Sequence, residues 1–523
     1  MKIKKTWLAV VAVIILVIPQ ILAEDLRYAK NGVDPDATGY WWLQSEKNWW
    51  TNAQYSVGAP DAAHFPTKDD VIYINSPLLA ESSKPLYIKE GDVIETKELW
   101  LNYGRAAWGS DGLWQYLDIN GGKMTNYGNV KIGSGGGTGY GYAFANFRQG
   151  VWNVLGTLAV GDGVENKPMS QGVLHVGTGA TLLVTNADFQ VGSGKGFGYG
   201  VVTNEGYVSY KNLQLCPWGD TYPQEQALYV MRGGTNYNAA CDSSAVDVLK
   251  IGSPVDRVSG VVRGWGYWDR GGDTGKNKGN IRMKMYGQVI ADGEGVERDM
   301  NMGWFVGVNS GITTETNISG TNGWFAVNKG RLIYPHRAEQ TGTTVSRTIG
   351  DERKNLAWDT PSDIINTVCL KGEMLSTDIG YGSWPWLQLY ASDRSDIPDL
   401  APVNPKHPHG RWLGVFRLGF FTKSDNSTIN PTSGDRTFNK MSLKFRYDHI
   451  GLRANRSPQI TLYRYDDTNG WIEQTSQIHN PDTPYISVED LAPRTTSTTD
   501  KWNLGWFAIK ADYEITGLIL LFK

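Results

Sequence analysis

The sequence predicts an all-β protein in which a parallel β-solenoid is followed by an antiparallel β-sandwich. Three observations lead to this fold class. The chain holds 62 glycines, which are costly inside regular structure and useful at tight turns. Short apolar segments recur between residues 99 and 252. Longer segments that alternate apolar and polar residues follow in the C-terminal part, as antiparallel strands do.

The first element is a signal peptide, predicted at residues 1–23. Lys2, Lys4 and Lys5 precede an apolar run from Trp7 to Val17, and the small Ala23 offers a cleavage point. The run is shorter than the roughly 20 residues of a membrane-spanning helix, so cleavage is favoured over an uncleaved anchor. No later stretch is long and apolar enough to span a bilayer. We therefore expect a secreted or cell-surface protein without a membrane span after cleavage.

Charge and cysteine content narrow the function classes. The formal net charge is −3, and it becomes −6 when the three signal-peptide lysines are removed, which argues against a generally basic nucleic-acid binder. Three cysteines are too few for a disulfide scaffold. One interpretation is a disulfide between Cys216 and Cys241 in an oxidising compartment, which leaves Cys369 over. The other interpretation is that the cysteines are buried free thiols.

Residues 24–98 are predicted to form an opening segment and a cap over the first coil. Four tryptophans crowd this region, namely Trp41, Trp42, Trp49 and Trp50. Their rings could stack on sugars or cover the solenoid end. Capping is favoured because an open solenoid end must be shielded from water.

Residues 99–340 are predicted to form the solenoid. The pattern apolar–any–apolar–Gly recurs at 130–133, 158–161, 174–177, 189–192 and 249–252. Two apolar residues at a spacing of two lie on one face of a strand, and glycine permits a bend after it. We predict inward-pointing side chains in stacked parallel strands for Val130, Ile132, Leu158, Val160, Leu174, Val176 and Val191. An antiparallel sandwich is the competing interpretation, but hairpin dipeptides such as Asn-Gly rarely separate these segments.

A second recurring element ends in asparagine, as in Thr125-Asn126, Thr185-Asn186 and Thr203-Asn204. Asparagine tolerates the left-handed conformation that strand corners often need. We therefore expect these asparagines at corners of the coils.

The segment 126–215 resembles the passenger repeats of autotransporter-type, pectate-lyase-like right-handed β-helices. The stretch 172–182, Gly-Val-Leu-His-Val-Gly-Thr-Gly-Ala-Thr-Leu, carries most of the likeness, and Trp49-Trp50-Thr51-Asn52 is similar to the tryptophan-rich opening of such bacterial surface repeats. The resemblance covers residues 40–335 and implies a right-handed β-helix. Lyases on this fold use clustered acidic calcium ligands and a basic catalytic residue. No segment here matches their motif, so no catalytic residue is carried over.

The C-terminal part is divided into a polar linker at 341–359 and a β-sandwich at 360–523. Alternating apolar and polar residues at 413–422, 440–447 and 459–465 predict antiparallel strands. Thr360-Pro361-Ser362-Asp363 could instead begin one short helix that runs through Val368, with proline at its first position.

The densest acidic cluster lies at 291–299 and supplies Asp292, Glu294 and Asp299 as candidate metal ligands. Carboxylate oxygens are the ligands that calcium prefers, and calcium is the only cofactor that the sequence suggests. The cluster lacks the spacing of an EF-hand. A solvated solenoid turn is the alternative, because Asp and Gly are expected there.

Tryptophan gives the remaining indication of function. Trp265 and Trp268 flank Gly266 and Tyr267 in a segment without clear repeat register, and apolar sugar faces stack on such rings. These two residues are the candidate carbohydrate-binding residues.

Two functional hypotheses follow from these features. The first is a non-catalytic surface protein with a structural, adhesive or polysaccharide-binding role, whose partner is a polysaccharide or the cell-surface matrix. The second is a secreted polysaccharide lyase or glycoside hydrolase on a β-helix. The chain shows no recognisable nucleophile, metal or cofactor motif, which favours the first. Acidic and basic residues from neighbouring coils that converge in one groove would favour the second.

Overall fold

The computed structural model describes a defined subset of the 523 residues. The described residues are 25–28, 40–43, 46, 49–51, 64–75, 79, 82–103, 112–135, 139–164, 169–194, 196–217, 226–239, 246–252, 260–269, 281–285, 287–295, 298–302, 318–319, 324–335, 340–341, 344–348, 364–365, 368–374, 383–390, 394–400, 411–422, 438–446, 459–479, 485–491 and 504–512. The predicted signal peptide and Cys241 therefore lie outside the described residues. Among the residues that are described, no helix is long and apolar enough to cross a membrane.

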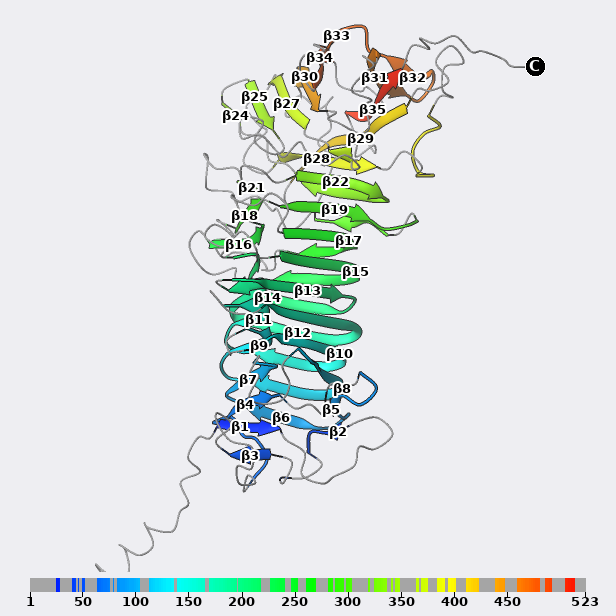
Figure 1. Ribbon diagram of the computed structural model, residues 1–523. Coiled ribbons are helices and arrows are strands. Elements are labelled where there is room, and N and C mark those ends of the chain that lie inside the picture. Colours follow the sequence, from blue (N-terminus) through cyan, green and yellow to red (C-terminus); the bar gives the residue numbers. More distant parts are fainter. Residues whose placement is uncertain are drawn as a thin grey trace, which may run out of the picture.

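A right-handed parallel β-solenoid forms the lower part of the molecule in Figure 1, as predicted. Successive coils stack along one axis, and their strands lie on three faces, here called faces 1, 2 and 3. Within each face the strands of neighbouring coils pair in parallel, as β9 and β11 do on face 1 and β13 and β15 do on face 2.

Several strands belong to one face only. Face 1 contains β1 (Asp25–Tyr28), β4 (Val71–Ile74), β7 (Glu98–Leu101), β9 (Val130–Ser134), β11 (Leu158–Gly163), β16 (Val246–Ile251), β18 (Ile281–Met285) and β21 (Ile318–Ser319). Face 2 contains β2 (Tyr40–Trp41), β5 (Leu86–Ile88), β13 (Gly198–Asn204), β19 (Gln288–Asp292) and β22 (Trp324–Lys329). Face 3 contains β6 (Val93–Thr96), β20 (Met300–Asn301) and β23 (Arg331–Pro335).

The longer strands turn a corner and contribute to more than one face. Those that run from face 2 into face 3 are β8 (Trp114–Asn126), β10 (Gly141–Val154), β15 (Gln226–Asn238) and β17 (Gly260–Asp269). The strand β12 (Ser170–Gly194) continues through all three faces, and β14 (Tyr207–Leu215) joins face 3 to face 1. The chain thus reaches its corners without leaving the β conformation.

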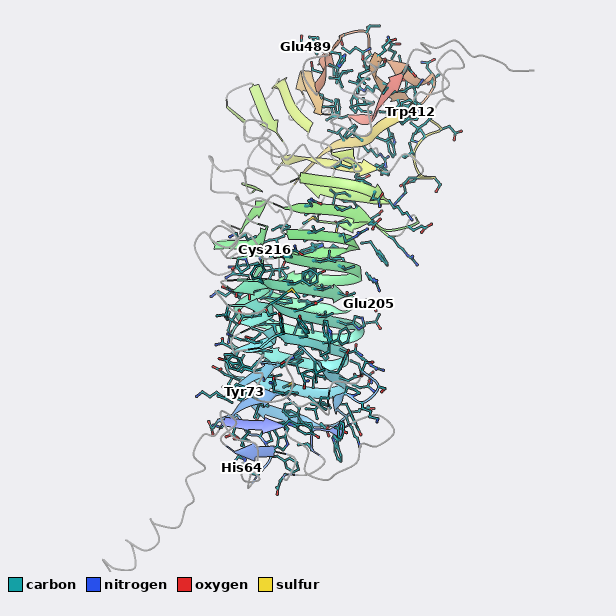
Figure 2. All side chains as sticks on the ribbon, viewed as in Figure 1. His64, Tyr73, Glu205, Cys216, Trp412 and Glu489 are labelled. Carbon is teal, nitrogen blue, oxygen red and sulfur yellow. The ribbon has the colours of Figure 1, made fainter. Side chains whose placement is uncertain are left out.

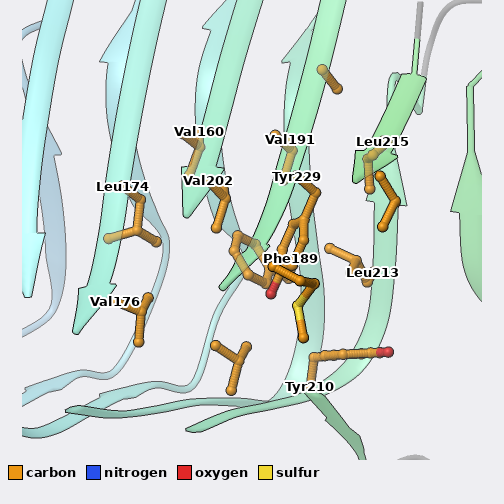
Figure 3. Packing of buried hydrophobic residues seen from close by; sticks show 14 of the residues in the cluster. Val160, Leu174, Val176, Phe189, Val191, Val202, Tyr210, Leu213, Leu215 and Tyr229 are labelled. Atoms are coloured by element: carbon orange, nitrogen blue, oxygen red, sulfur yellow. The ribbon is translucent and has the colours of Figure 1, made fainter. Parts of the chain in front are cut away.

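The core consists of the inward side chains of the three faces (Figure 3). The seven residues predicted to point inward, from Val130 to Val191, are all fully buried. They lie in parallel ladders, where Leu158 pairs with Val130 on one side and with Phe189 on the other. This part of the prediction is confirmed, because a period of two leaves no other place for paired apolar residues on a thin coil.

Four of the five recurring glycines share one structural role. Gly133, Gly161, Gly192 and Gly252 have positive φ values at the end of a face 1 strand, whereas Gly177 does not. A Cβ on Gly161 would lie 2.1 Å from the carbonyl oxygen of Tyr199, which belongs to the face 2 strand β13. Glycine is required at such a position by both the backbone conformation and the close approach of two strands.

The recurring asparagines do not adopt the predicted left-handed conformation. Among the described residues, only Asn102 and Cys216 are non-glycine residues with positive φ. Asn126 and Asn204 are instead fully buried. Asn126 accepts a hydrogen bond of 2.7 Å from Trp152 Nε1 and donates one of 2.6 Å to Thr96 Oγ1. Asn126 and Asn204 therefore lie inside the core, which the sequence pattern alone did not indicate, whereas Asn186 is exposed.

The N-terminal end of the solenoid is covered by aromatic side chains. The strand β3 (Trp49–Thr51) pairs antiparallel with β1 and ends the parallel stacking. Trp42 and Trp49 are fully buried, with ring centroids 4.9 Å apart, and Tyr28 packs on Trp49 at 5.1 Å. These two tryptophans cap the core, which excludes them as exposed sugar-stacking residues.

At the C-terminal end the solenoid sheet changes direction and continues into the sandwich (Figure 1). The strands β26 (Ile364–Ile365) and β28 (Ser383–Tyr390) pair antiparallel with β22 and β23. The sheet continues through β29 (Arg411–Thr422), β35 (Gly505–Asp512), β31 (Gln459–Asp466) and β32 (Gly470–Glu473). Antiparallel pairing thus uses the hydrogen-bonding groups that the last coil would otherwise leave open.

A second antiparallel sheet packs on this continuation. Its strands are β24 (Gln340–Thr341), β25 (Thr344–Thr348), β27 (Val368–Met374), β30 (Phe438–Arg446), β34 (Tyr485–Leu491) and β33 (Gln477–His479). Phe445 of this sheet contacts Phe416 and Phe507 of the other, at ring-centroid distances of 5.0 and 5.4 Å. The fold class is therefore a right-handed β-solenoid followed by an antiparallel β-sandwich.

Two local features differ from expectation. The segment 341–359, predicted as a linker, contains the strand β25. The helix considered for residues 360 to 368 is replaced by strand at Ile364–Ile365 and from Val368 onward. Ile364 and Ile365 pair with Val327 and Ala326, so the need to cover the last coil outweighs the local helix signal.

Candidate functional site

The outer surface of face 2 carries four aromatic side chains on two adjacent strands. Trp114 and Tyr116 lie on β8, and Tyr142 and Phe144 lie beside them on β10 in direct register. The ring centroids of Trp114 and Tyr142 are 5.7 Å apart, and those of Tyr116 and Phe144 are 6.1 Å apart. All four are partly exposed. We call these four residues the aromatic platform.

Strand periodicity explains why these rings point outward. The residues that alternate with them along the strands, Gln115, Ala143 and Ala145, are buried and face the core. The outward row continues on the next coils with the partly exposed Val173, Val201 and Leu228, which follow Phe144 in register. The platform is therefore one end of a longer apolar strip that runs along the solenoid axis.

A row of polar side chains lies next to the apolar strip. Asp118, Asn146 and His175 occupy the next outward position on three successive coils. Asn146 Nδ2 donates to Asp118 Oδ2 at 3.4 Å, and His175 Nδ1 lies 2.8 Å from Asn146 Oδ1. His175 Nε2 lies 3.4 Å from a carboxylate oxygen of Glu205 on the following coil. Residues far apart in sequence thus form one hydrogen-bonded line across four coils.

Asp118 is the most perturbed carboxylate in this line. Burial raises the pKa of Asp118, and Arg148, whose guanidinium lies 2.7 Å from Asp118 Oδ2, offsets only part of this effect. The other carboxylate oxygen, Oδ1, is buried and has no hydrogen-bond partner among the described residues. Desolvation therefore opposes the charged form of this side chain.

Basic side chains follow the edge where the face 2 strands end and face 3 begins. We call Arg148, Arg232, Arg263, Arg298 and Lys329 the cationic ridge. Glu205, labelled in Figure 2 at the right-hand edge of the solenoid, lies among them and is 3.8 Å from Arg232. The five ridge residues are exposed, while Asp118, Glu205 and Asp292 beneath them are largely covered.

The predicted calcium ligands Asp292 and Glu294 are ion-pair partners of this ridge. Asp292 pairs with Arg263 and accepts a hydrogen bond of 2.8 Å from Asn328 Nδ2. Glu294 is exposed and lies 3.4 Å from Lys329 Nζ. Asp292 and Glu294 therefore have different partners, and these contacts do not bring the two carboxylates to one shared metal position.

Asp299, the third predicted ligand, belongs to the junction between the solenoid and the sandwich. It accepts hydrogen bonds from Arg331 Nε at 2.9 Å and from Arg394 Nη1 at 2.8 Å. Burial would lower the pKa of Arg331, but its hydrogen bonds to Asp299 and Tyr390 outweigh this and raise it. Two guanidinium groups thus occupy the carboxylate oxygens that a calcium ion would need.

The calcium hypothesis is not supported by these contacts. Across the described part of the chain, no group of three or more His, Cys, Asp or Glu side chains is arranged to hold a metal ion. Each of the three predicted acids has a cationic partner instead. The dense acidic turn is explained by the arginines and lysine that surround it.

The two predicted carbohydrate-binding tryptophans have different environments. Trp268 is fully buried and packs on Tyr229 at 5.8 Å, so it is a core residue with no ring face for a sugar. Trp265 is partly exposed on the cationic ridge, with the guanidinium of Arg298 5.1 Å from its ring centroid. The structure does not bring the two rings together on one surface.

The residues of the new site carried a weak signal in the sequence. Trp114-Gln115-Tyr116 and Tyr142-Ala143-Phe144 each place two aromatics at a spacing of two, which predicts one exposed or buried face of a strand. His175 was visible only as a single polar residue in a strand. Its neighbours Asn146 and Glu205 come from other coils, so the hydrogen-bonded line depends on the register between strands of neighbouring coils, which the sequence does not show.

The chain was compared with models of protein families, with curated proteins and with solved structures, and none of the three comparisons gives a match.

Proposed function

We propose that this is a secreted or cell-surface protein whose solenoid binds polysaccharide on face 2 without cleaving it. The observation that carries the proposal is the aromatic platform, in which Trp114, Tyr116, Tyr142 and Phe144 present partly exposed rings on two adjacent coils. The apolar faces of sugar rings stack on such side chains.

The row beside the platform supplies the polar contacts that a sugar needs. Asn146, His175 and Glu205 carry donors and acceptors at the edge of the apolar strip. A mainly apolar surface with a few fixed polar groups is the usual character of a binding site for an organic ligand. Because the strip is long and shallow, each contact is weak and affinity increases with polymer length.

A second function, cleavage of the bound polymer, is favoured by one observation. Asp118 has a raised pKa because of burial, and it belongs to a line with His175 and Glu205. An acid with a raised pKa can act as a general acid. The pairing of Asp118 with Arg148 and Asn146 also gives it a structural role, so binding without turnover is the primary proposal.

Retention on affinity gels made with neutral and acidic polysaccharides tests the proposal. The affinity that the gels report for the variant Trp114→Ala/Tyr142→Ala should be about fivefold or more below that of the natural protein, because the variant loses two stacking contacts. The matched control is Tyr207→Ala/Tyr237→Ala, which removes a pair of rings at 6.2 Å on face 3. This control should bind as the natural protein does.

Two outcomes would replace the proposal. If the natural protein is retained on none of the gels, the solenoid is a spacer without a polysaccharide ligand. If it releases reducing ends or unsaturated products, and Asp118→Asn abolishes this release while binding persists, the protein is an enzyme.

A further inference from the structure

We infer that the polysaccharide is a linear acidic polymer that lies along the solenoid axis, with its carboxylate or sulfate groups held by the cationic ridge. This inference rests on the proposed function, because the ridge follows the edge of the same face that carries the aromatic platform. It adds the chemical class of the ligand, which the aromatic rings alone do not specify.

The first argument is the layering of charge along the ridge. The side chains of Arg148, Arg232, Arg263 and Lys329 are 57%, 57%, 44% and 50% exposed. The carboxylates of Asp118, Glu205 and Asp292 are only 12%, 26% and 16% exposed. Acids therefore form an inner layer that holds basic groups outward, so an approaching ligand meets guanidinium and ammonium groups first. Glu294, at 80% exposed, is the exception.

The second argument is the unused hydrogen-bonding capacity of the arginines. A guanidinium has five N–H donors in a planar fork that matches carboxylate and other oxyanions. Arg148 contacts Asp118 through Nη2, and Arg232 lies 3.8 Å from Glu205, which is longer than a hydrogen bond. Both side chains can therefore bind an oxyanion and keep their carboxylate neighbours.

The third argument is the shared geometry of the platform and the ridge. Tyr142, Phe144, Asn146 and Arg148 follow one another at a spacing of two on β10, so one strand leads from the platform to the ridge. Neighbouring coils are spaced about 4.8 Å apart, and the corner position of Arg148 is held by Gly177, Glu205 and Arg232 on the three coils that follow. A polymer that lies along the apolar strip thus runs parallel to the ridge, and its side groups reach basic residues that are separated by several coils.

The ridge fits an acidic polysaccharide better than a nucleic acid. The chain has a net charge of −3, and acidic side chains lie beneath or beside the ridge cations. Nucleic-acid affinity depends on extended unpaired positive charge that displaces many counterions. The ridge instead offers separated guanidinium groups beside aromatic rings, which suits a polymer with spaced oxyanions and apolar sugar faces.

The experiment measures dissociation constants for four probes at low and high salt. The probes are homogalacturonan oligosaccharides for carboxylate, chondroitin sulfate oligosaccharides for sulfate together with carboxylate, cello-oligosaccharides as neutral chains, and a 20-base-pair duplex DNA. The main variant is Arg148→Gln/Arg232→Gln, and Arg232→Gln alone leaves the Asp118 pair intact. The matched control is Lys97→Gln/Lys123→Gln, which removes the same charge from exposed positions away from face 2. Circular dichroism melting checks that each variant is folded.

We expect the natural protein to bind at least one acidic polymer more tightly than the neutral chains, with affinity that falls as salt rises. The double ridge variant should lose about threefold to thirtyfold in acidic-polymer affinity and keep its neutral-chain affinity. Arg232→Gln should show part of this loss, and the lysine control should show none. Comparison of the two acidic probes then identifies whether sulfate adds to binding.

Other results would overturn the inference and can be told apart from failure of the proposed function. Equal affinity for acidic and neutral chains, unchanged in both ridge variants, would refute the ridge and leave the platform proposal standing. Tighter binding of the DNA duplex than of either acidic polymer would assign the ridge to nucleic acid. Absence of binding to every probe would refute the proposed function together with the inference.

Discussion

The guanidinium of Arg394 donates a hydrogen bond of 2.8 Å to the carboxylate of Asp299, 95 residues earlier in the chain. Arg394 also forms hydrogen bonds of 2.9 and 3.1 Å with Asp396. Its side chain is only 4% exposed. The contact ties the start of the C-terminal region to the acidic turn of the solenoid, which is where sequence pattern had suggested a calcium site.

Replacing Arg394 by Met should destabilise this junction by about 3 kcal/mol, because Asp299 and Asp396 would each lose a buried partner. The expected signs are a lower urea midpoint and faster amide exchange in β23 and β28. Lys329→Met is the matched control, since its pair with Glu294 is exposed and worth less than about 1 kcal/mol. Equal effects of the two substitutions would contradict a structural role for the buried pair.

Val176→Asp should unfold the solenoid or lower its stability by more than about 4 kcal/mol, because an unpaired charge would enter the core. Val176 lies on β12 and is fully buried, and this part of β12 pairs in parallel with β10 and β13. Val173 lies three residues earlier on the same strand and is partly exposed on face 2. Val173→Asp should therefore cost less than about 1.5 kcal/mol by thermal or urea unfolding. Similar losses for both would contradict the inward and outward assignment.

The repeated fold could be predicted because its signals are local. A spacing of two before glycine places Val130, Ile132 and Val176 inward whatever the details of the corners. The same reasoning failed for asparagine, since the pattern cannot distinguish a left-handed corner from a buried side chain such as Asn126. Both roles favour the same residue at the same place in a coil.

The candidate site was less predictable because it depends on register between coils. His175 contacts Asn146 and Glu205 only because β10, β12 and β13 stack in one particular register. The partners of the acidic turn come from farther away still, as Arg394 does for Asp299. An acidic cluster in a sequence therefore indicates negative charge. Whether a metal ion or an arginine neutralises that charge depends on residues that only the folded structure brings close.

Gly161→Ala should destabilise the solenoid by several kcal/mol, roughly 3 or more, because a Cβ would lie 2.1 Å from the Tyr199 carbonyl oxygen and φ is +72°. Gly91→Ala is the matched control. Gly91 also has a positive φ, of +86°, but no atom lies within 4 Å of its added Cβ. It should cost only the conformational penalty of about 1 to 2 kcal/mol. Equal losses in urea unfolding would show that close packing of the two strands adds nothing.

The last prediction concerns the pH dependence of stability at Asp118. Burial raises the pKa of Asp118 in the folded protein above its ordinary value of 3.8, so the folded state binds this proton more tightly than the unfolded state. The contribution of Asp118 to the free energy of unfolding is therefore greatest below the unfolded pKa. It is lost as pH rises through the folded pKa.

Asp118→Asn removes this titration and keeps the size of the side chain. Stability measured relative to the natural protein should therefore increase from pH 3 to pH 7, whatever constant offset the lost ion pair with Arg148 introduces. Because Arg148 lowers the pKa of Asp118, Arg148→Gln should have the opposite effect and extend the decline in stability to higher pH. Melting temperatures of the three proteins between pH 3 and pH 7 check both directions. A difference between Asp118→Asn and the natural protein that stays constant or shrinks with rising pH would show that desolvation does not dominate at this carboxylate.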